Sequence, residues 1–246
     1  MPARWSGGPR GLTFPRARRV AEAGLAFAGL MALAVPAHAQ VAGSISLSSS
    51  EMFRGESISS ADPALSASIS LDSGSGLFAG ASATLALNIK EPRVSAAVQY
   101  VGFAQRHGSL SYEVGVIHRS YARITDRDYR RGFFEGFVGL GVGGARARVY
   151  VSPDYLVDGR TSFYAEINAP LLRHEKWQLD GHAGLSLIPH ELGARSRALR
   201  HYQDWRLTVS RPVGPLFLSL GINATNYPVY SDTGRGRVFA SAAYAF

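Results

Sequence analysis

The sequence contains no cysteine, so no disulfide bond can stabilise its fold. A chain exported without disulfides depends on sheet hydrogen bonds, on burial or on insertion into a membrane. Lysine is nearly absent too, since only Lys90 and Lys176 are lysines among the 26 basic residues. After residue 39 no apolar run approaches the roughly 20 residues of a transmembrane helix, which excludes a helical membrane protein.

The first 39 residues have the composition of a targeting segment. Five arginines precede an apolar run from Ala23 to Val35, and a small-x-small sequence ends at Ala39. This pattern predicts a signal peptide over 1–39, cleaved after its last residue. Without this segment the net charge falls from +8 to +4. The basic composition is therefore weak evidence for nucleic-acid binding, and no nucleic-acid partner is expected.

The remaining residues, 40–246, alternate apolar and polar side chains over many short segments. A period of two is typical of β-strands whose two faces meet different surroundings. Twelve segments show it: 41–48, 65–71, 77–88, 94–100, 110–116, 133–142, 145–152, 162–169, 177–187, 204–210, 216–225 and 237–246. The connections between them are mostly short turns alternating with longer polar loops, as in outer-membrane barrels.

Alternation alone also fits a soluble barrel or sandwich with its apolar face inward. The leader, the strand count and the terminal Phe246 favour the membrane. We therefore predict an all-β fold, a single closed antiparallel transmembrane β-barrel of about 12 strands in the outer membrane of a Gram-negative bacterium. Phe246 resembles the terminal signal read by the barrel assembly machinery, an expected partner. Aromatic residues near strand ends predict interfacial girdles: Tyr100, Phe103, Tyr112, Trp177, Trp205, Tyr244 and Phe246.

If the apolar faces contact lipid, the opposite faces line a lumen rich in charge. The predicted lumen residues are Arg54, Glu113, Arg119, Glu135, Arg146, Arg148, Glu166, Asp180, His182, Asp204, Arg206 and Arg237. Two interpretations stay open: the charges pair and plug a structural barrel, or they line a narrow pore for small polar or anionic solutes. Twelve strands lie between filled eight-stranded barrels and open porins of about 16–18 strands.

The longer loops are rich in arginine, which suggests either contact with the phosphates of lipopolysaccharide in the outer leaflet or simply solvated surface loops. The arginines concerned are Arg123, Arg127, Arg130, Arg131, Arg195, Arg197 and Arg200. Asp126 and Asp128 are too few ligands for calcium, and no metal or cofactor is expected.

A third and weakest hypothesis is a lipid-acting hydrolase. His118 and Ser120 share the outward face of a strand, but a serine nucleophile also needs an orienting group. Glu135 points inward by alternation, so the residues predict no enzyme.

One stretch resembles a known family. It reads Phe53-Arg54-Gly55-Glu56-Ser57, then Asp62-Pro63-Ala64, then Gly76-Leu77-Phe78-Ala79-Gly80. These motifs resemble the opening hairpin of the TorF-type porin family of proteobacterial outer-membrane proteins. The likeness covers about 30 residues, while the rest agrees in length, strand pattern and terminal phenylalanine. Serines replace the family's usual aromatic residues in the first two strands. The resemblance implies an outer-membrane barrel that acts as a channel, with no established substrate and no catalytic residues.

The Phe-Arg-Gly triplet ends the first predicted strand. Alternation with the serines at 44, 46, 48 and 50 turns Arg54 inward, where it should meet an inward carboxylate. The same alternation turns Phe53 towards the lipid interface. It also turns Glu51 outward, unless a bulge shifts the register.

Overall fold

The computed structural model describes residues 40–121, 131–155, 160–191, 197–226 and 237–246. The predicted signal peptide, 1–39, lies outside these ranges. So do the loop residues Arg123, Arg127, Arg130 and Arg195, together with Asp126 and Asp128. Within the described ranges, no helix is long and apolar enough to cross a membrane.

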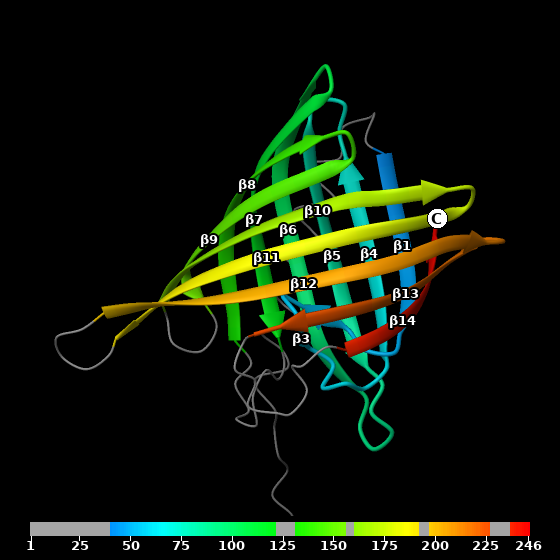
Figure 1. The fold of residues 1–246 in the computed structure, drawn as a ribbon, viewed down its shortest axis with the longest axis horizontal. Coiled ribbons are helices and arrows are strands. Elements are labelled where there is room, and N and C mark those ends of the chain that lie inside the picture. Colours follow the sequence, from blue (N-terminus) through cyan, green and yellow to red (C-terminus); the bar gives the residue numbers. More distant parts are fainter. Residues whose placement is uncertain (1–39, 122–130, 156–159, 192–196, 227–236) are drawn as a thin grey trace, which may run out of the picture. The chain divides into compact units, whose positions relative to one another are not determined.

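Twelve strands form a closed antiparallel barrel, which confirms the predicted fold class (Figure 1). Their bounds are β1 Gln40–Ser48, β4 Ala64–Asp72, β5 Leu77–Ala86, β6 Arg93–His107, β7 Leu110–Tyr121, β8 Arg131–Val142, β9 Ala145–Tyr155, β10 Arg160–His174, β11 Trp177–Glu191, β12 Arg197–Val213, β13 Leu216–Thr225 and β14 Arg237–Ala245. Each strand pairs with its neighbours in sequence, and β1 pairs with β14 to close the ring.

The two ends of the barrel differ in their connections. Short turns join strands at one end, the turn end, where β1 begins and β14 finishes. Longer connections lie at the opposite end, the loop end, and include 49–63 and 87–92. Bacterial outer-membrane barrels have short turns on the periplasmic side and longer loops outside. We therefore take the loop end as the outer one.

The outer surface of the barrel is apolar. Val114, Val138 and Leu220 are 51%, 57% and 58% exposed, although they stand in the middle of regular strands. Closing the sheet pairs the backbone groups of all the strands and leaves no edge, so such a surface can lie in hydrocarbon. The packed side chains are inside the ring. Two interior clusters hold Ile58, Ala96, Tyr121, Phe133 and Tyr155, and Ile117, Phe137, Tyr150 and Tyr164.

One predicted girdle residue, Tyr100, has the wrong orientation in the prediction because β6 contains a bulge. The β5–β6 register shifts between Thr84 and Leu85, so the side chains of β6 change face. Tyr100 consequently packs against the second interior cluster instead of facing lipid. Other predicted girdle residues are exposed: Tyr112, Trp177, Trp205, Tyr244 and Phe246.

Two further strands, β2 (Met52–Phe53) and β3 (Glu56–Ser57), form a small antiparallel hairpin that does not pair with any strand of the barrel sheet. Arg54 and Gly55 at its tip have φ values of 48° and 81°. Positive φ at both central residues is the mark of a type I′ turn, the turn that suits a two-residue hairpin. Glycine takes this conformation freely, whereas an arginine needs compensating contacts to hold it.

Candidate functional site

The β2–β3 hairpin, Met52–Ser57, lies inside the barrel, and we call it the lumen hairpin. Its tip contacts several parts of the wall. The Arg54 guanidinium donates to Oε1 of Glu135 on β8 at 2.7 Å and lies 3.9 Å from the ring centre of Tyr164 on β10. Nδ2 of Asn223 on β13 donates to the carbonyl of Gly55 at 3.0 Å. The hairpin therefore bridges strands that are far apart around the ring.

Glu135 is the inward carboxylate that Arg54 meets. Its other oxygen, Oε2, accepts a hydrogen bond from Nε of Arg119 at 2.9 Å. The Glu135 carboxylate therefore accepts hydrogen bonds from two guanidinium groups. The side chains of Arg54 and Glu135 are only 8% and 1% exposed. Burial opposes the charge of Arg54, yet attraction to Tyr155 and Glu135 raises its pKa above the ordinary value. Removing the carboxylate would leave uncompensated buried charge, which is strongly destabilising.

The structure corrects the predicted orientation of two neighbours of Arg54. Phe53 does not face lipid: its ring centre lies 5.0 Å from that of Tyr121, inside the barrel. Glu51 also lies inside, where it accepts from the hydroxyls of Ser48 and Ser66. Strand alternation fails here because β1 ends at Ser48 and the chain then folds inward.

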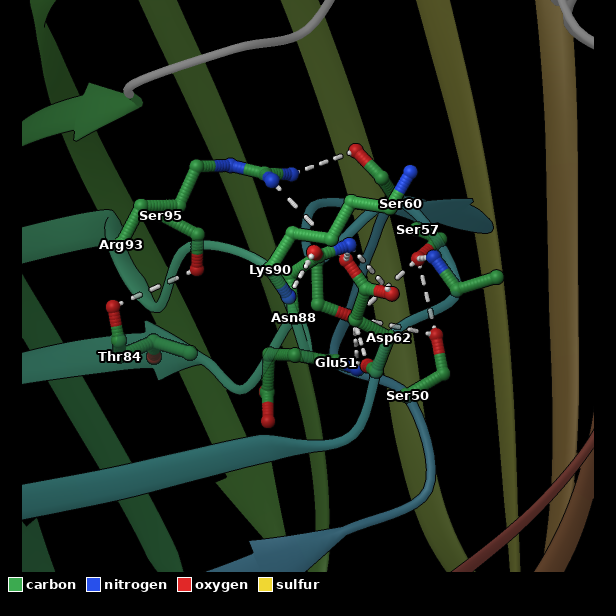
Figure 2. Close-up of polar contacts among 12 residues, drawn as sticks. Ser50, Glu51, Ser57, Ser60, Asp62, Thr84, Asn88, Lys90, Arg93 and Ser95 are labelled. Carbon is green, nitrogen blue, oxygen red and sulfur yellow. Dashed lines mark hydrogen bonds and ion pairs between the residues drawn. The ribbon is translucent and has the colours of Figure 1, made fainter.

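A network of small polar side chains fixes the base of the lumen hairpin (Figure 2). Oγ atoms of Ser50 and Ser57 lie 2.8 Å apart, and Oγ of Ser59 accepts from the backbone N–H of Glu51 at 3.1 Å. On the β6 side, Arg93 reaches Ser60. Serine fits here because its hydroxyl both donates and accepts. The serines of this stretch therefore hold the segment that leads into the lumen.

Glu56 is the poorly compensated group of the hairpin. Its Oε1 is buried and has no hydrogen-bond partner among the described residues. Burial raises the pKa of Glu56 to about 7, because the charged form loses its hydration. The groups around it include Arg54, Tyr155, Tyr202 and Asp204.

Two adjoining cavities lie on the turn side of the lumen hairpin. One, of about 300 Å³, reaches Arg54 and Gly55, and the other, of about 490 Å³, reaches Gly144 in a turn. They share five wall residues: Arg148, Glu166, Asn168, His182 and Arg206. Another cavity beside the hairpin, next to Glu56 and Tyr202, holds only about 30 Å³. The hairpin therefore lies beside cavities of very different size.

Six inward residues form a continuous row across neighbouring strands β9 to β14. Register pairs link each residue to the next: Arg146, Asn168, His182, Arg206, Asn223 and Arg237. We call this set the donor row, because its side chains are arginines, amides and an imidazole, with no carboxylate. It starts beside a turn at Arg146 and finishes at Arg237, the first residue of β14. Since barrel strands are tilted, the row climbs from the turn end towards the loop end.

Carboxylates occupy positions beside the donor row and neutralise part of the arginine charge. Glu113 on β7 accepts from Nε and Nη2 of Arg148 at 2.7 and 2.9 Å, and Arg146 approaches it at 3.7 Å. Oδ1 of Asp204 lies 2.7 Å from Nε2 of His182. Within the described chain Arg206 has no hydrogen bond, although it lines both cavities and lies near enough to attract Glu51.

The structure places the predicted lumen residues as follows. Arg54 is on the hairpin, and the strand residues are on the inward face: Glu113, Arg119, Arg146, Arg148, Glu166, Asp180, Asp204, Arg206 and Arg237. Glu166 accepts from the Tyr150 hydroxyl, and Asp180 accepts from Gln178. Alternation puts Tyr164, Asn168 and Asn223 on the same face, but nothing in the sequence indicates that they contact a folded-in hairpin or form a row.

No group of histidine and carboxylate side chains in the described ranges has the geometry of a metal site.

The comparisons agree with the fold. The chain is similar to the KdgM porin over 83% of its own length and 99% of that chain, with 8% identity and a TM-score of 0.51. It is also similar to the NanC porin over 84% of its length and 98% of that chain, at 6% identity and a TM-score of 0.47. At such an identity the likeness to the KdgM porin shows the fold alone. No curated protein matches the sequence.

A closed barrel of this kind with an apolar outer surface spans the outer membrane. Residues 34–245 match the model of a bacterial protein family of unknown function, Gcw_chp. The chain belongs to that family.

Proposed function

We propose that the protein is a porin-like channel for the passive passage of small polar or anionic solutes. The donor row carries the proposal, because five of its six residues line two adjoining cavities and the row ascends along the lumen without a carboxylate of its own. Solute anions would pass along donors whose charge is only partly neutralised, with the lumen hairpin as the narrowest point. The porin fold and the resemblance to the TorF-type porin family support this function.

Two other parts of the chain fit the same proposal. The segment 1–39 would export the chain as a signal peptide, which makes 40–246 the working barrel. The terminal Phe246 is 68% exposed and would be accessible to the barrel assembly machinery.

The test is single-channel recording in planar bilayers containing a salt gradient. We expect the wild-type protein to conduct, and Arg206→Glu to shift the reversal potential towards cation preference. Lys176→Glu makes the same charge change in an exposed turn and should leave the reversal potential unchanged. Absence of conductance from the wild-type protein, or identical reversal potentials in all three proteins, would reject the channel.

A plugged structural barrel is the second candidate, and the buried Arg54–Glu135 pair favours it. In this case the loops would contact lipopolysaccharide or a partner. Replacing residues 52–57 by a glycine-serine linker distinguishes a plugged barrel from a channel. A plugged barrel conducts only after the replacement, whereas a channel conducts before it and more strongly afterwards.

A further inference from the structure

Three polar side chains form a cluster on the outer surface of the barrel. Gln99 on β6 and His118 and Ser120 on β7 lie on the outward face, next in alternation to Val101 and Val116, which are 48% and 47% exposed. Polar groups on a lipid-facing surface are costly, and where they occur they commonly mark function. The cluster lies close to the loop end, since β7 finishes at Tyr121.

Gln99 fixes the orientation of the imidazole. Nδ1 of His118 lies 2.9 Å from Oε1 of Gln99. An amide oxygen can only accept, so Nδ1 carries the proton and Nε2 keeps a free lone pair. The ring of Phe134 packs beside the imidazole, with centroids 4.6 Å apart. The histidine is therefore held in the tautomer that a general base requires.

Nε2 of His118 and Oγ of Ser120 converge over a glycine. A Cβ atom added at Gly132 would lie 2.6 Å from Nε2 and 3.0 Å from Oγ. Gly136, two positions further along the outward face of β8, would have no atom within 4 Å of its Cβ. Glycine at 132 therefore leaves a small space that both Nε2 of His118 and Oγ of Ser120 border.

The structure supplies the orienting group that the sequence did not reveal. Glu135 cannot take this role, because it is inside the barrel with Arg54 and Arg119. Gln99 takes it because the bulge in β6 turns this residue outward. Alternation without the bulge points Gln99 into the lumen.

We propose that Ser120 and His118 form the nucleophile and general base of a lipid-ester hydrolase site, with Gln99 as a positioning residue. This activity is independent of the channel and departs from the expectation of no enzyme. Oγ of Ser120 attacks the ester carbonyl carbon while its proton passes to Nε2 of His118. The ester bond to the lipid alcohol breaks, and the alcohol oxygen takes that proton from Nε2. Water then attacks the acyl-serine through the same base, releasing a fatty acid and restoring the serine.

The position of the cluster identifies the substrate class as an ester-linked acyl chain of an outer-leaflet lipid. The exposed apolar surface of Val116 and Phe134 lies directly beside it. Ester bonds of membrane lipids lie at the boundary between head groups and acyl chains, and this cluster lies near the outer margin of the apolar surface. Phospholipids and lipopolysaccharide share this ester chemistry.

The experiment uses the full folded barrel in two sets of vesicles, one of phosphatidylethanolamine and one containing lipopolysaccharide. Released fatty acid is measured by mass spectrometry, and the active set identifies the source of the ester. We expect Ser120→Ala and His118→Ala to lose at least tenfold in rate. A fluorophosphonate probe should label the wild-type protein at Ser120. No fatty acid from either set, or an undiminished rate in Ser120→Ala, would overturn the proposal.

Glycine substitutions provide a matched pair. Gly132→Ala should abolish hydrolysis, because its methyl group fills the space between Nε2 and Oγ, whereas Gly136→Ala should keep the wild-type rate. Heat-modified mobility on gels checks that every variant is folded. Equal rates in the two folded glycine variants would contradict the site.

A third comparison tests Gln99 as a positioning residue. Gln99→Leu should lower kcat with KM unchanged, and Gln99→Glu, which keeps an acceptor oxygen, should retain activity. A purely structural role would instead leave kcat intact in every folded variant.

Discussion

Arg54 carries its positive charge in a part of the lumen where its side chain is largely shielded from water. Its guanidinium is held by a carboxylate that is itself only 1% exposed and by the face of Tyr164. Interactions between charges are stronger in such surroundings, and so is the cost of losing a partner. The backbone of Arg54 is also in the left-handed region, with φ of 48°. Strained residues of this kind persist where the surrounding contacts enforce them.

The first prediction concerns Glu135. Glu135→Gln keeps the shape of the side chain but leaves Arg54 and Arg119 without their shared counter-charge. We expect the free energy of unfolding to fall by about 3–5 kcal/mol, as for other broken buried ion pairs. Urea unfolding of the barrel in lipid vesicles measures this free energy. Glu175→Gln, in an exposed turn, should change the value by no more than about 0.5 kcal/mol. Equal losses from both variants would contradict this account.

The sequence predicts the orientation and contacts of some residues better than those of others. Alternation places Glu113 and Arg148 on one face, and they do meet there. Arg54 is predicted to meet a carboxylate, but the identity of that carboxylate depends on strands more than 80 positions away. Phe53 is placed wrongly because alternation assumes a strand where the chain forms a turn. Single-sequence patterns report local geometry and carry no information about such long-range contacts.

The alternation of apolar and polar residues does not predict the lumen hairpin. Two residues on each side of a turn are too few to show a period of two. Its position depends on tertiary contacts with β8, β10 and β13. An isolated two-stranded hairpin is marginally stable in water, so these contacts are needed to keep it folded. Because β2 and β3 take no part in the barrel sheet, we expect that the hairpin can leave its site in the lumen without unfolding the barrel.

The second prediction is a pH dependence of docking through Glu56. Its pKa is about 7 in the docked hairpin and 4.5 in the unfolded chain, so the docked state binds the proton more tightly. Stability of docking is therefore fully present below pH 4.5 and falls as pH rises to about 7, by roughly 2–3 kcal/mol. Channel open probability should rise over the same range.

Glu56→Gln tests this linkage. It cannot ionise, so single-channel recordings should show an open probability with little pH dependence, close to that of the wild-type protein at low pH. Glu91→Gln, an exposed residue of the connection before β6, is the matched control and should keep the wild-type profile. A Glu56→Gln profile identical to that of the wild-type protein would rule out this carboxyl as the sensor.

At the scale of the whole molecule, stability depends on how the ring closes. The pairing of β1 with β14 has only five register pairs, from Ser44 to Ser48. The terminal residue extends this seam, because Gly43 and Phe246 exchange backbone hydrogen bonds of 2.8 and 2.9 Å. The periodicity of β1 and β14 predicts that they are strands of a barrel. It does not predict their contact, because their pairing partners stand at opposite ends of the sequence.

The last prediction tests this seam. The phenyl ring of Phe246 lies over Gly43, where an added Cβ would be 2.6 Å from the ring. Gly43→Val should displace the ring and weaken closure by about 1–3 kcal/mol, the usual cost of overpacking. Heat-modified mobility on gels should then be lost at a lower temperature. Gly136→Val, with open space around it, should leave this temperature unchanged.

The same variant separates two roles of the terminal phenylalanine. Gly43→Val leaves Phe246 in place, so recognition by the assembly machinery should be intact while the finished barrel is less stable. Phe246→Ala should reduce both the amount of barrel inserted in cells and its stability after purification. If Gly43→Val lowered insertion as much as Phe246→Ala while the purified barrel kept wild-type stability, the ring would not contribute to closing the seam.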